Sequence, residues 1–222
     1  MMDDDIRRWM RLVEAAAIPT LAFPTLYHVG SLDPKHKRRD SYEGAGLSVS
    51  IHPAEWRQIA RGLVAGQTWA LTKAKNKFIA ATRLSKTQKA MIAQWAVTNG
   101  WAESSTIYRL SWFDDEMDDT MYSDFTTREE AEREAYDPED ADIKEIPGTL
   151  IATDALRHRT NNDAAPVTVP DLILTVYAEE LGYDGVWWDD RLDVRNYSAP
   201  RGVIVPSKIK TWTVLKPTSI SG

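Results

Sequence analysis

Residues 26–31 and 46–50 hold the polar side chains best suited to binding a ligand. His28 lies in a β-rich run beside a glycine, and Ser48 and Ser50 alternate along a second run. Alternate residues of a strand share one face, so the two serines could hydrogen-bond one ligand. Taken alone, such a histidine is more often a structural residue, and such serines more often face solvent on an edge strand.

A third segment, residues 181–190, ends an aromatic strand with two adjacent carboxylates, Asp189 and Asp190. Asp184 stands before Gly185 in an ordinary turn signal, so we expect its carboxylate to serve that turn. Neighbouring residues of a strand point to opposite faces. Asp189 and Asp190 therefore cannot both reach one ligand if the strand continues through them. Taken alone, the pair is equally typical of a solvated turn.

Motifs of several common enzyme classes are missing from the sequence. The four histidines lack metal-ligand spacing, and there is no cysteine, so we expect neither a metal site nor a disulfide. Neither G-x-G-x-x-G nor a P-loop nor a G-x-S-x-G elbow occurs. Dehydrogenases, P-loop NTPases and common hydrolases are therefore disfavoured.

Composition is that of an ordinary globular protein, with 43% hydrophobic and 27% charged residues. The start lacks the pattern of a signal peptide, and no apolar stretch approaches the roughly 20 residues of a membrane span, so we expect a cytosolic protein without a membrane partner. The net charge of −6 argues against broad nucleic-acid binding. Residues 57–89 carry only basic charges and residues 114–145 are mostly acidic, so the two segments either face each other or water, or one of them binds a charged partner.

The elements that position these residues follow from periodicity and from helix and turn signals. We expect helices over 6–17, 85–97, 127–135 and 170–181, and one from Pro53 to Gly66. We expect strands over 25–30, 47–51, 68–71, 106–113, 148–153, 186–188, 202–205 and 209–214, and loops over 31–46, 138–145 and 158–168. Helices and strands mix without a strict β-α-β rhythm, which favours a single α+β domain.

The order of the motifs is similar to that of the ADP-ribosyltransferase superfamily, including small phage anti-CRISPR and toxin-type members. The matching segments are Leu26-Tyr27-His28-Val29, the run Gly46 to Ser50 with a following helix and Trp56, Gly182-Tyr183-Asp184-Gly185-Val186, and Val203 to Pro206 with Lys208-Ile209-Lys210. The resemblance covers about residues 24–66 and 172–214. It implies a split β-sheet around an NAD-binding cleft, with a central insertion at about 67–165.

The resemblance also implies roles for individual residues, with NAD as the substrate. His28 would bind a ribose hydroxyl, the backbone of Val29 and Gly30 would hold the nicotinamide amide, and Ser48 or Ser50 would support the ribose. The NAD rings would be covered by Trp56 or Tyr42, and Tyr27 would belong to the same site. Breaking the nicotinamide–ribose bond develops positive charge on the ribose, so a nearby carboxylate is needed.

The sequence departs from the family pattern at this carboxylate. Many relatives place a glutamate just before the last apolar strand, where this chain has Gly202 preceded by Arg201. The anti-CRISPR-like members instead place an aspartate after the Gly-Tyr-x-x-Val strand. That position corresponds best to Asp190, with Asp189 and Asp193 as alternatives.

Three functions remain open from the sequence. The first is a mono-ADP-ribosyltransferase that modifies a protein or nucleic-acid acceptor, as phage or mobile-element members of the family do. The second is a catalytically inactive binding protein with the same fold, which Gly202 favours. The third is an RNA 2′-phosphotransferase-like enzyme that uses the basic residues of 57–89.

Overall fold

The computed structural model describes residues 18–33, 46–61, 67–114, 119–135, 142–160, 169–195 and 197–215. The expected helix over 6–17, the end of the second helix at Gly66, and Tyr42 lie outside the described residues. The chain combines helices with two β-sheets, which confirms an α+β arrangement in general terms.

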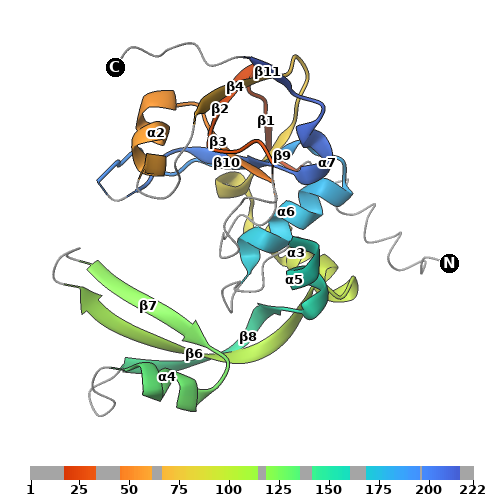
Figure 1. Ribbon diagram of the computed structural model, residues 1–222. Coiled ribbons are helices and arrows are strands. Elements are labelled where there is room, and N and C mark those ends of the chain that lie inside the picture. Colours follow the sequence, from red (N-terminus) through yellow and green to blue (C-terminus); the bar gives the residue numbers. More distant parts are fainter. Residues whose placement is uncertain are drawn as a thin grey trace.

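The larger sheet has eight strands in a curled arrangement (Figure 1). Their order is β1 (Thr20–Leu21), β5 (Phe78–Ala80), β9 (Gly185–Trp188), β10 (Arg201–Ile204), β3 (Leu47–Ser50), β2 (Thr25–Val29), β4 (Thr68–Thr72) and β11 (Thr213–Leu215). Among the described strands, β5 and β9 alone pair in parallel. The four strands that carry the motifs, β9, β10, β3 and β2, are consecutive in this order, which confirms the expectation that they join one sheet.

Side-chain alternation gives this sheet two apolar faces. The inner face of the curl holds one buried cluster: Leu26, Leu47, Val49, Leu71, Phe78, Trp187, Ile204 and Trp212. The other face carries Ile79, Val186 and Val203, which pack with α3 (Lys86–Thr98) and α6 (Pro170–Glu180). The central strands β5 and β9 therefore bury both sets of alternate residues, whereas β11 at one edge is exposed.

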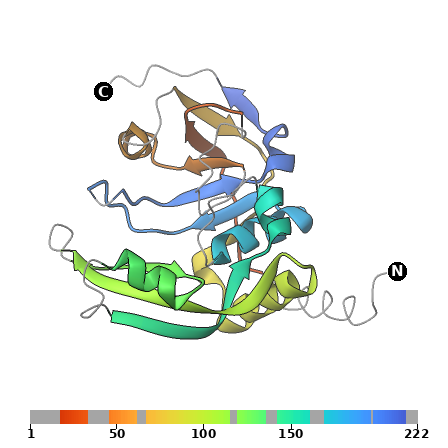
Figure 2. The same ribbon diagram turned by 60° about the horizontal axis from the view of Figure 1, so that its bottom comes forward.

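The smaller sheet has three antiparallel strands in the order β7 (Asp119–Phe125), β6 (Ala102–Asp114) and β8 (Asp142–Ala152). Figure 1 shows it on the far side of α3 and α6 from the main sheet, and Figure 2 shows α4 (Arg128–Glu134) lying along it. The predicted capping box of α4 is confirmed between Thr127 and Glu130. Hydrogen bonds from Thr126 and Thr127 lower the pKa of Glu130.

Residues 142–145 were expected in a loop, and that expectation is wrong, because β8 begins at Asp142 and pairs along β6. The pairing shifts between Ser105 and Ile107, where β8 carries an extra residue around Pro147. A bulge of this kind accommodates a proline, which cannot donate a ladder hydrogen bond. Residues 142–152 therefore form one long strand that contains a bulge at Pro147.

Three further expectations needed correction. The loop expected from His158 begins later, because α5 (Asp154–Thr160) extends into it. The strand expected over 209–214 is shorter, since α7 (Pro206–Ile209) precedes it and β11 begins at Thr213. The insertion expected at about 67–165 is also shorter in the structure. β4 and β5 are strands of the larger sheet, η2 (Ala81–Arg83) and α3 pack beside it, and the smaller sheet spans residues 102–152. The helix from Pro53 is confirmed as α2 (Pro53–Arg61), which packs against β2.

Candidate functional site

One row of side chains crosses four motif-bearing strands on a single face of the main sheet. Tyr27 pairs with Ser50, Ser50 with Arg201, and Arg201 with Trp188. Residues directly opposite each other in antiparallel strands have Cβ atoms about 4.5–5.5 Å apart on the same face. These four residues, the cross-strand row, therefore bring together the first, second and last motifs of the sequence.

Asp190 joins the cross-strand row through an ion pair with Arg201. Arg201 Nη1 donates to Asp190 Oδ2 at 2.6 Å, and the two side chains are 26% and 29% exposed. The Arg201 guanidinium also lies 5.9 Å from the centre of the Trp188 ring, within the range of a cation–π contact. The arrangement holds a carboxylate in a fixed place while leaving it accessible from solvent.

Asp189 turns to the opposite side, as strand alternation predicts for a neighbour of Asp190. Its Oδ1 accepts a hydrogen bond from Trp187 Nε1 at 2.9 Å, and its Oδ2 accepts one from Arg83 Nη2 at 3.2 Å. Trp187 belongs to the cluster on the inner face of the curl. Asp189 is thus tied to the inner face, and Asp190 is the acid that accompanies the cross-strand row.

Gly202 occupies the place where the family pattern has a glutamate, and the structure gives a steric reason for the glycine. A Cβ atom at Gly202 would lie 2.6 Å from Cε3 of Trp187 and 2.7 Å from the carbonyl oxygen of Val186. Trp187 is 1% exposed and its ring centre is 4.2 Å from that of Phe23. The indole therefore fills the space that a side chain at 202 would need.

His28 lies where β2 and β3 separate after the single pair between Tyr27 and Ser50. Its Nδ1 is 2.8 Å from the carbonyl oxygen of Ser48, and its Nε2 is 2.8 Å from that of Ser31. Carbonyl oxygens only accept hydrogen bonds, so both contacts form together only when both ring nitrogens carry a proton. The ring therefore bridges two backbone segments, and a ribose hydroxyl would have to replace one of these partners.

The side chains of His28 and of Ser48 or Ser50 were expected to contact one ligand, and alternation places the histidine and the serines on opposite faces of the sheet. Alternation places His28 on the inner face with Leu26, whereas the two serines alternate with inner-face residues of β3. Ser50 is fully buried, and its Oγ donates to the carbonyl oxygen of Pro200 at 2.6 Å. Ser50 therefore links β3 to the residue before β10 by a hydrogen bond. Ser48 is half-buried.

The backbone expected to hold the nicotinamide amide is engaged within the protein. The Gly30 N–H donates to the carbonyl oxygen of Gln67 at 3.0 Å, and its carbonyl accepts from Trp69 Nε1 at 2.9 Å. Val29 pairs with β4. Gly30 has a φ of 112°, which explains the glycine. Of the remaining expected ligand residues, Tyr27 and Trp56 are half-buried and carry surface that a ligand can contact.

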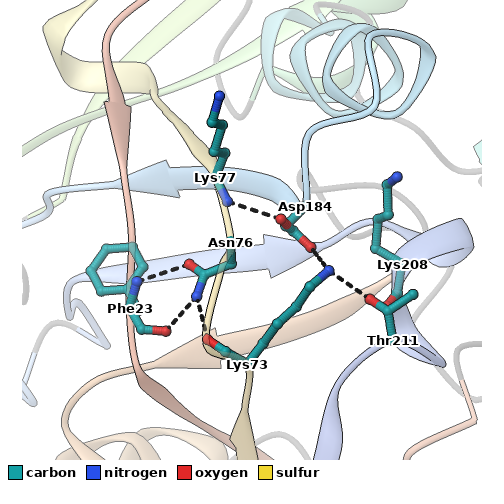
Figure 3. A network of polar contacts seen from close by, with 7 residues as sticks. All are labelled: Phe23, Lys73, Asn76, Lys77, Asp184, Lys208 and Thr211. Atoms are coloured by element: carbon teal, nitrogen blue, oxygen red, sulfur yellow. Dashed lines mark hydrogen bonds and ion pairs between the residues drawn. The ribbon is translucent and has the colours of Figure 1, made fainter.

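Asp184 does not serve the turn at Gly185, contrary to expectation, but anchors a distant loop (Figure 3). Its Oδ1 accepts from Lys73 Nζ at 2.5 Å and its Oδ2 accepts from the Lys77 N–H at 2.9 Å. Lys73 Nζ also donates to Thr211 Oγ1 at 2.8 Å. Because Asp184 is 6% exposed, this is a buried structural network.

Asn76 continues the same network toward Phe23. Its Oδ1 accepts from the Phe23 N–H at 2.8 Å, and its Nδ2 donates to the carbonyl oxygens of Phe23, at 2.8 Å, and Lys73, at 2.9 Å. Figure 3 shows these contacts beside those of Asp184. The network thereby fixes the residue whose ring stacks on Trp187.

A mostly apolar hollow of about 310 Å³ lies beside Trp188, between η2, α3, β8 and α6. Its charged lining residues are Lys89 and Asp171. Trp188 Nε1 donates to Asp171 Oδ1 at 3.0 Å, which fixes the indole at the border between the hollow and the cross-strand row. Sequence reasoning missed this hollow because residues 171 and 188 lie far from 82–93 in the chain.

The basic and acidic segments do not face each other in the ion pairs found among the described residues. Lys73 and Arg83, from the basic segment, pair with Asp184 and Asp189. The three pairs that involve the acidic segment are formed within the region of the small sheet: Arg109–Asp124, Arg128–Glu132 and Lys144–Asp142. Lys73 and Arg83, which belong to the basic segment suggested for RNA binding, therefore form ion pairs within the protein.

None of the described helices is both long enough and apolar enough to cross a membrane. The described histidine and acidic side chains form no cluster of three that could hold a metal ion.

Comparisons of the chain with protein-family models, with curated proteins and with solved structures found no match. The functional assignment therefore depends on the residues of the cross-strand row and the acids beside it.

Proposed function

We propose that this chain binds NAD at the cross-strand row and transfers its ADP-ribose to a macromolecular acceptor. The observation that carries the proposal is the Asp190–Arg201 ion pair, which holds an accessible carboxylate beside the strands with the three motifs. The consecutive order of β9, β10, β3 and β2 supports it, since one ligand can then contact all of these strands.

Transfer of ADP-ribose from NAD needs a carboxylate beside the nicotinamide ribose. The bond between the ribose carbon and the nicotinamide nitrogen breaks, and its electron pair leaves with nicotinamide. An acceptor nucleophile then bonds to the ribose carbon and loses its proton. Positive charge develops on the ribose during this exchange, and a preorganised anion stabilises it. Asp190 is the anion in this proposal, and Arg201 holds it in place.

Other residues have supporting roles in the proposal. Tyr27 belongs to the cross-strand row, Ser48 lies on β3 with Ser50, and Trp56 lies on α2. All three are half-buried, so they are the residues we assign to ligand contact. His28 acts mainly by position, because its ring connects the Ser48 carbonyl to the loop at Ser31.

A second candidate is a catalytically inactive NAD-fold binding protein. The observation that favours it is the packing of Trp187 against Gly202, which closes the usual acid position. Both candidates predict NAD binding, and only the first predicts release of nicotinamide. The two are therefore separated by one assay on the same sample.

The test measures NAD binding by calorimetry and nicotinamide release by chromatography for the wild-type chain, Asp190→Asn and Asp189→Asn. The two variants make the same chemical change at adjacent residues that turn to opposite sides. We expect Asp190→Asn to lose at least about 100-fold in turnover, the scale of a lost electrostatic contact to the transition state. Asp189→Asn should stay close to the wild type.

The outcomes distinguish the possibilities. Loss confined to Asp189→Asn would show that the inner face carries the acid. Full activity in both variants would remove this turn from the mechanism. Binding without nicotinamide release would favour the inactive binder, and absence of NAD binding by the folded chain would end both candidates.

A further inference from the structure

The hollow beside Trp188 has an apolar floor and a mouth that opens to solvent. Its buried lining side chains are all apolar: Ala81, Leu84, Ile92, Ile173, Leu174 and Trp188. Three other lining residues, Thr82, Lys89 and Pro170, are exposed and mark the mouth. A concave, mostly apolar site with few polar groups at its edge is typical of small-molecule binding.

The size of the hollow limits its occupant. Its volume is about 310 Å³, which is at the lower end of the range for ligand sites. At roughly 30 Å³ for each water-sized group, the hollow holds about ten non-hydrogen atoms with their hydrogens. It is therefore too small for NAD or for a peptide helix, and it fits a small apolar molecule.

Asp171, one of the two charged lining residues, has its charge offset within the protein. Its Oδ1 accepts a hydrogen bond from Trp188 Nε1 at 3.0 Å. Asp171 also lies in the first turn of α6, where the helix dipole stabilises a carboxylate. These two contacts give the Asp171 carboxylate a structural role at the border of the hollow.

Lys89, the other charged lining residue, has an ammonium that is available to a ligand. Lys89 is exposed, and its ammonium has no hydrogen-bond or ion-pair partner within the part of the chain that the structure describes. The neighbouring Arg83 pairs instead with Asp189. Residues 82–93 contain no acidic side chain. The mouth therefore carries an unpaired positive charge, which attracts an anionic group.

We propose that the hollow binds a medium-chain monocarboxylate, with its hydrocarbon chain on the apolar floor and its carboxylate at Lys89 Nζ. Burial of the chain supplies affinity, and the charge-assisted hydrogen bond fixes the orientation. Asp171 repels a carboxylate placed beside it, which directs the head group toward Lys89. The site needs no NAD and does not rest on the proposed function, because the ligand lies on the hollow side of Trp188.

The test is a calorimetric titration of the full chain with octanoate, whose eight carbons and two oxygens match the size of the hollow. Three related probes separate the contributions of chain and charge. Octylammonium keeps the chain and reverses the charge, octanol keeps the chain and removes the charge, and acetate keeps the carboxylate and removes most of the chain.

Two matched pairs of variants on α3 accompany the probes. Lys89→Gln removes the ammonium, and Lys86→Gln makes the same change at an exposed residue outside the lining. Ala93→Phe places a ring in the hollow, and Ala90→Phe places the same ring at an exposed position outside it. Thermal unfolding shows whether each variant is folded, and the exposed lysine pair decides the outcome alone if Ala93→Phe is not.

We expect octanoate to bind the wild type, Lys86→Gln and Ala90→Phe equally, Lys89→Gln at least about tenfold more weakly, and Ala93→Phe not measurably. Octanol should bind the wild type about as weakly as octanoate binds Lys89→Gln, and octylammonium and acetate should not bind measurably. Equal binding of octylammonium would assign the head group to Asp171 and overturn the choice of a carboxylate. Unchanged binding in Lys89→Gln, or no saturable binding of octanoate by the wild type, would overturn the proposal.

Discussion

Removing the Asp184 carboxylate is the perturbation whose effect on folding the structure defines best. In Asp184→Ala, the Lys73 ammonium and the Lys77 N–H each lose their partner on a group that is 6% exposed (Figure 3). The Lys73 side chain is itself 22% exposed and keeps its hydrogen bond to Thr211. The ammonium is therefore only partly stranded, because it can still reach water.

These contacts set the expected loss of stability. Removing one partner of a buried ion pair costs about 3–5 kcal/mol, and the exposure of Lys73 places this case at about 3 kcal/mol. For a chain of this size, 1 kcal/mol corresponds to roughly 2–4 °C in melting temperature. Asp184→Ala should therefore lower the melting temperature by about 6–12 °C.

The assay is thermal unfolding followed by circular dichroism, with Asp142→Ala as the matched control. Asp142 pairs with Lys144 at 2.9 Å, but their side chains are 56% and 66% exposed. Exposed pairs contribute about 0–1 kcal/mol, so this variant should change the melting temperature by less than about 4 °C. Similar shifts in the two variants would refute the view that burial makes the Asp184 network important.

Two other residues give sharp expectations. Gly202→Ala should destabilise the fold by about 1–3 kcal/mol in chemical denaturation, because its Cβ would lie 2.6 Å from a Trp187 ring carbon; an unchanged midpoint would show that the indole moves aside easily. Burial raises the pKa of Tyr177 to about 12, and its hydroxyl has no hydrogen-bond partner among the described residues. Tyr177→Phe should therefore stabilise the chain by about 1 kcal/mol at neutral pH, and equal or lower stability would refute this. In the wild type the unfolded chain releases the Tyr177 proton near pH 10, whereas the folded chain releases it only near pH 12. The free energy of unfolding of the wild type should therefore fall as pH rises through this window, and Tyr177→Phe should lack this part of the fall.

Local signals predicted most of the elements that the motifs occupy. The run of alternating residues at 47–51 and the helix signals at Pro53 and Pro170 correspond to β3, α2 and α6. Expectations failed where pairing overrides local preference. Residues 142–145 were expected in a loop, yet β6 pairs with them as part of β8, and a bulge accommodates Pro147. Strand β7 was not expected at all, because the polar residues of its sequence DTMYSDF come in adjacent pairs rather than alternating, and it follows an acidic run.

The candidate site was less predictable because its partners come from distant parts of the chain. Asp189 and Asp190 follow the end of β9 and contact different arginines, and nothing local to them indicates Arg83 or Arg201. A similar limit applies to Asp184, whose Asp-Gly setting is a genuine turn signal. Its carboxylate instead meets Lys73, which is 111 residues away in the sequence.

The glycine at 202 and the tryptophan at 187 together decide which side of the sheet is available for a ligand. They are directly paired on β10 and β9, and the indole fills the inner face where the family pattern would place an acid. The next pair along the same strands, Arg201 with Trp188, turns to the opposite face and carries Asp190. The inner face thus has no room for a side chain at 202, and the accessible carboxylate of Asp190 is paired with Arg201 on the other face. In the proposed function the ligand therefore lies on the face of the cross-strand row, and His28 holds the backbone at Ser48 and Ser31.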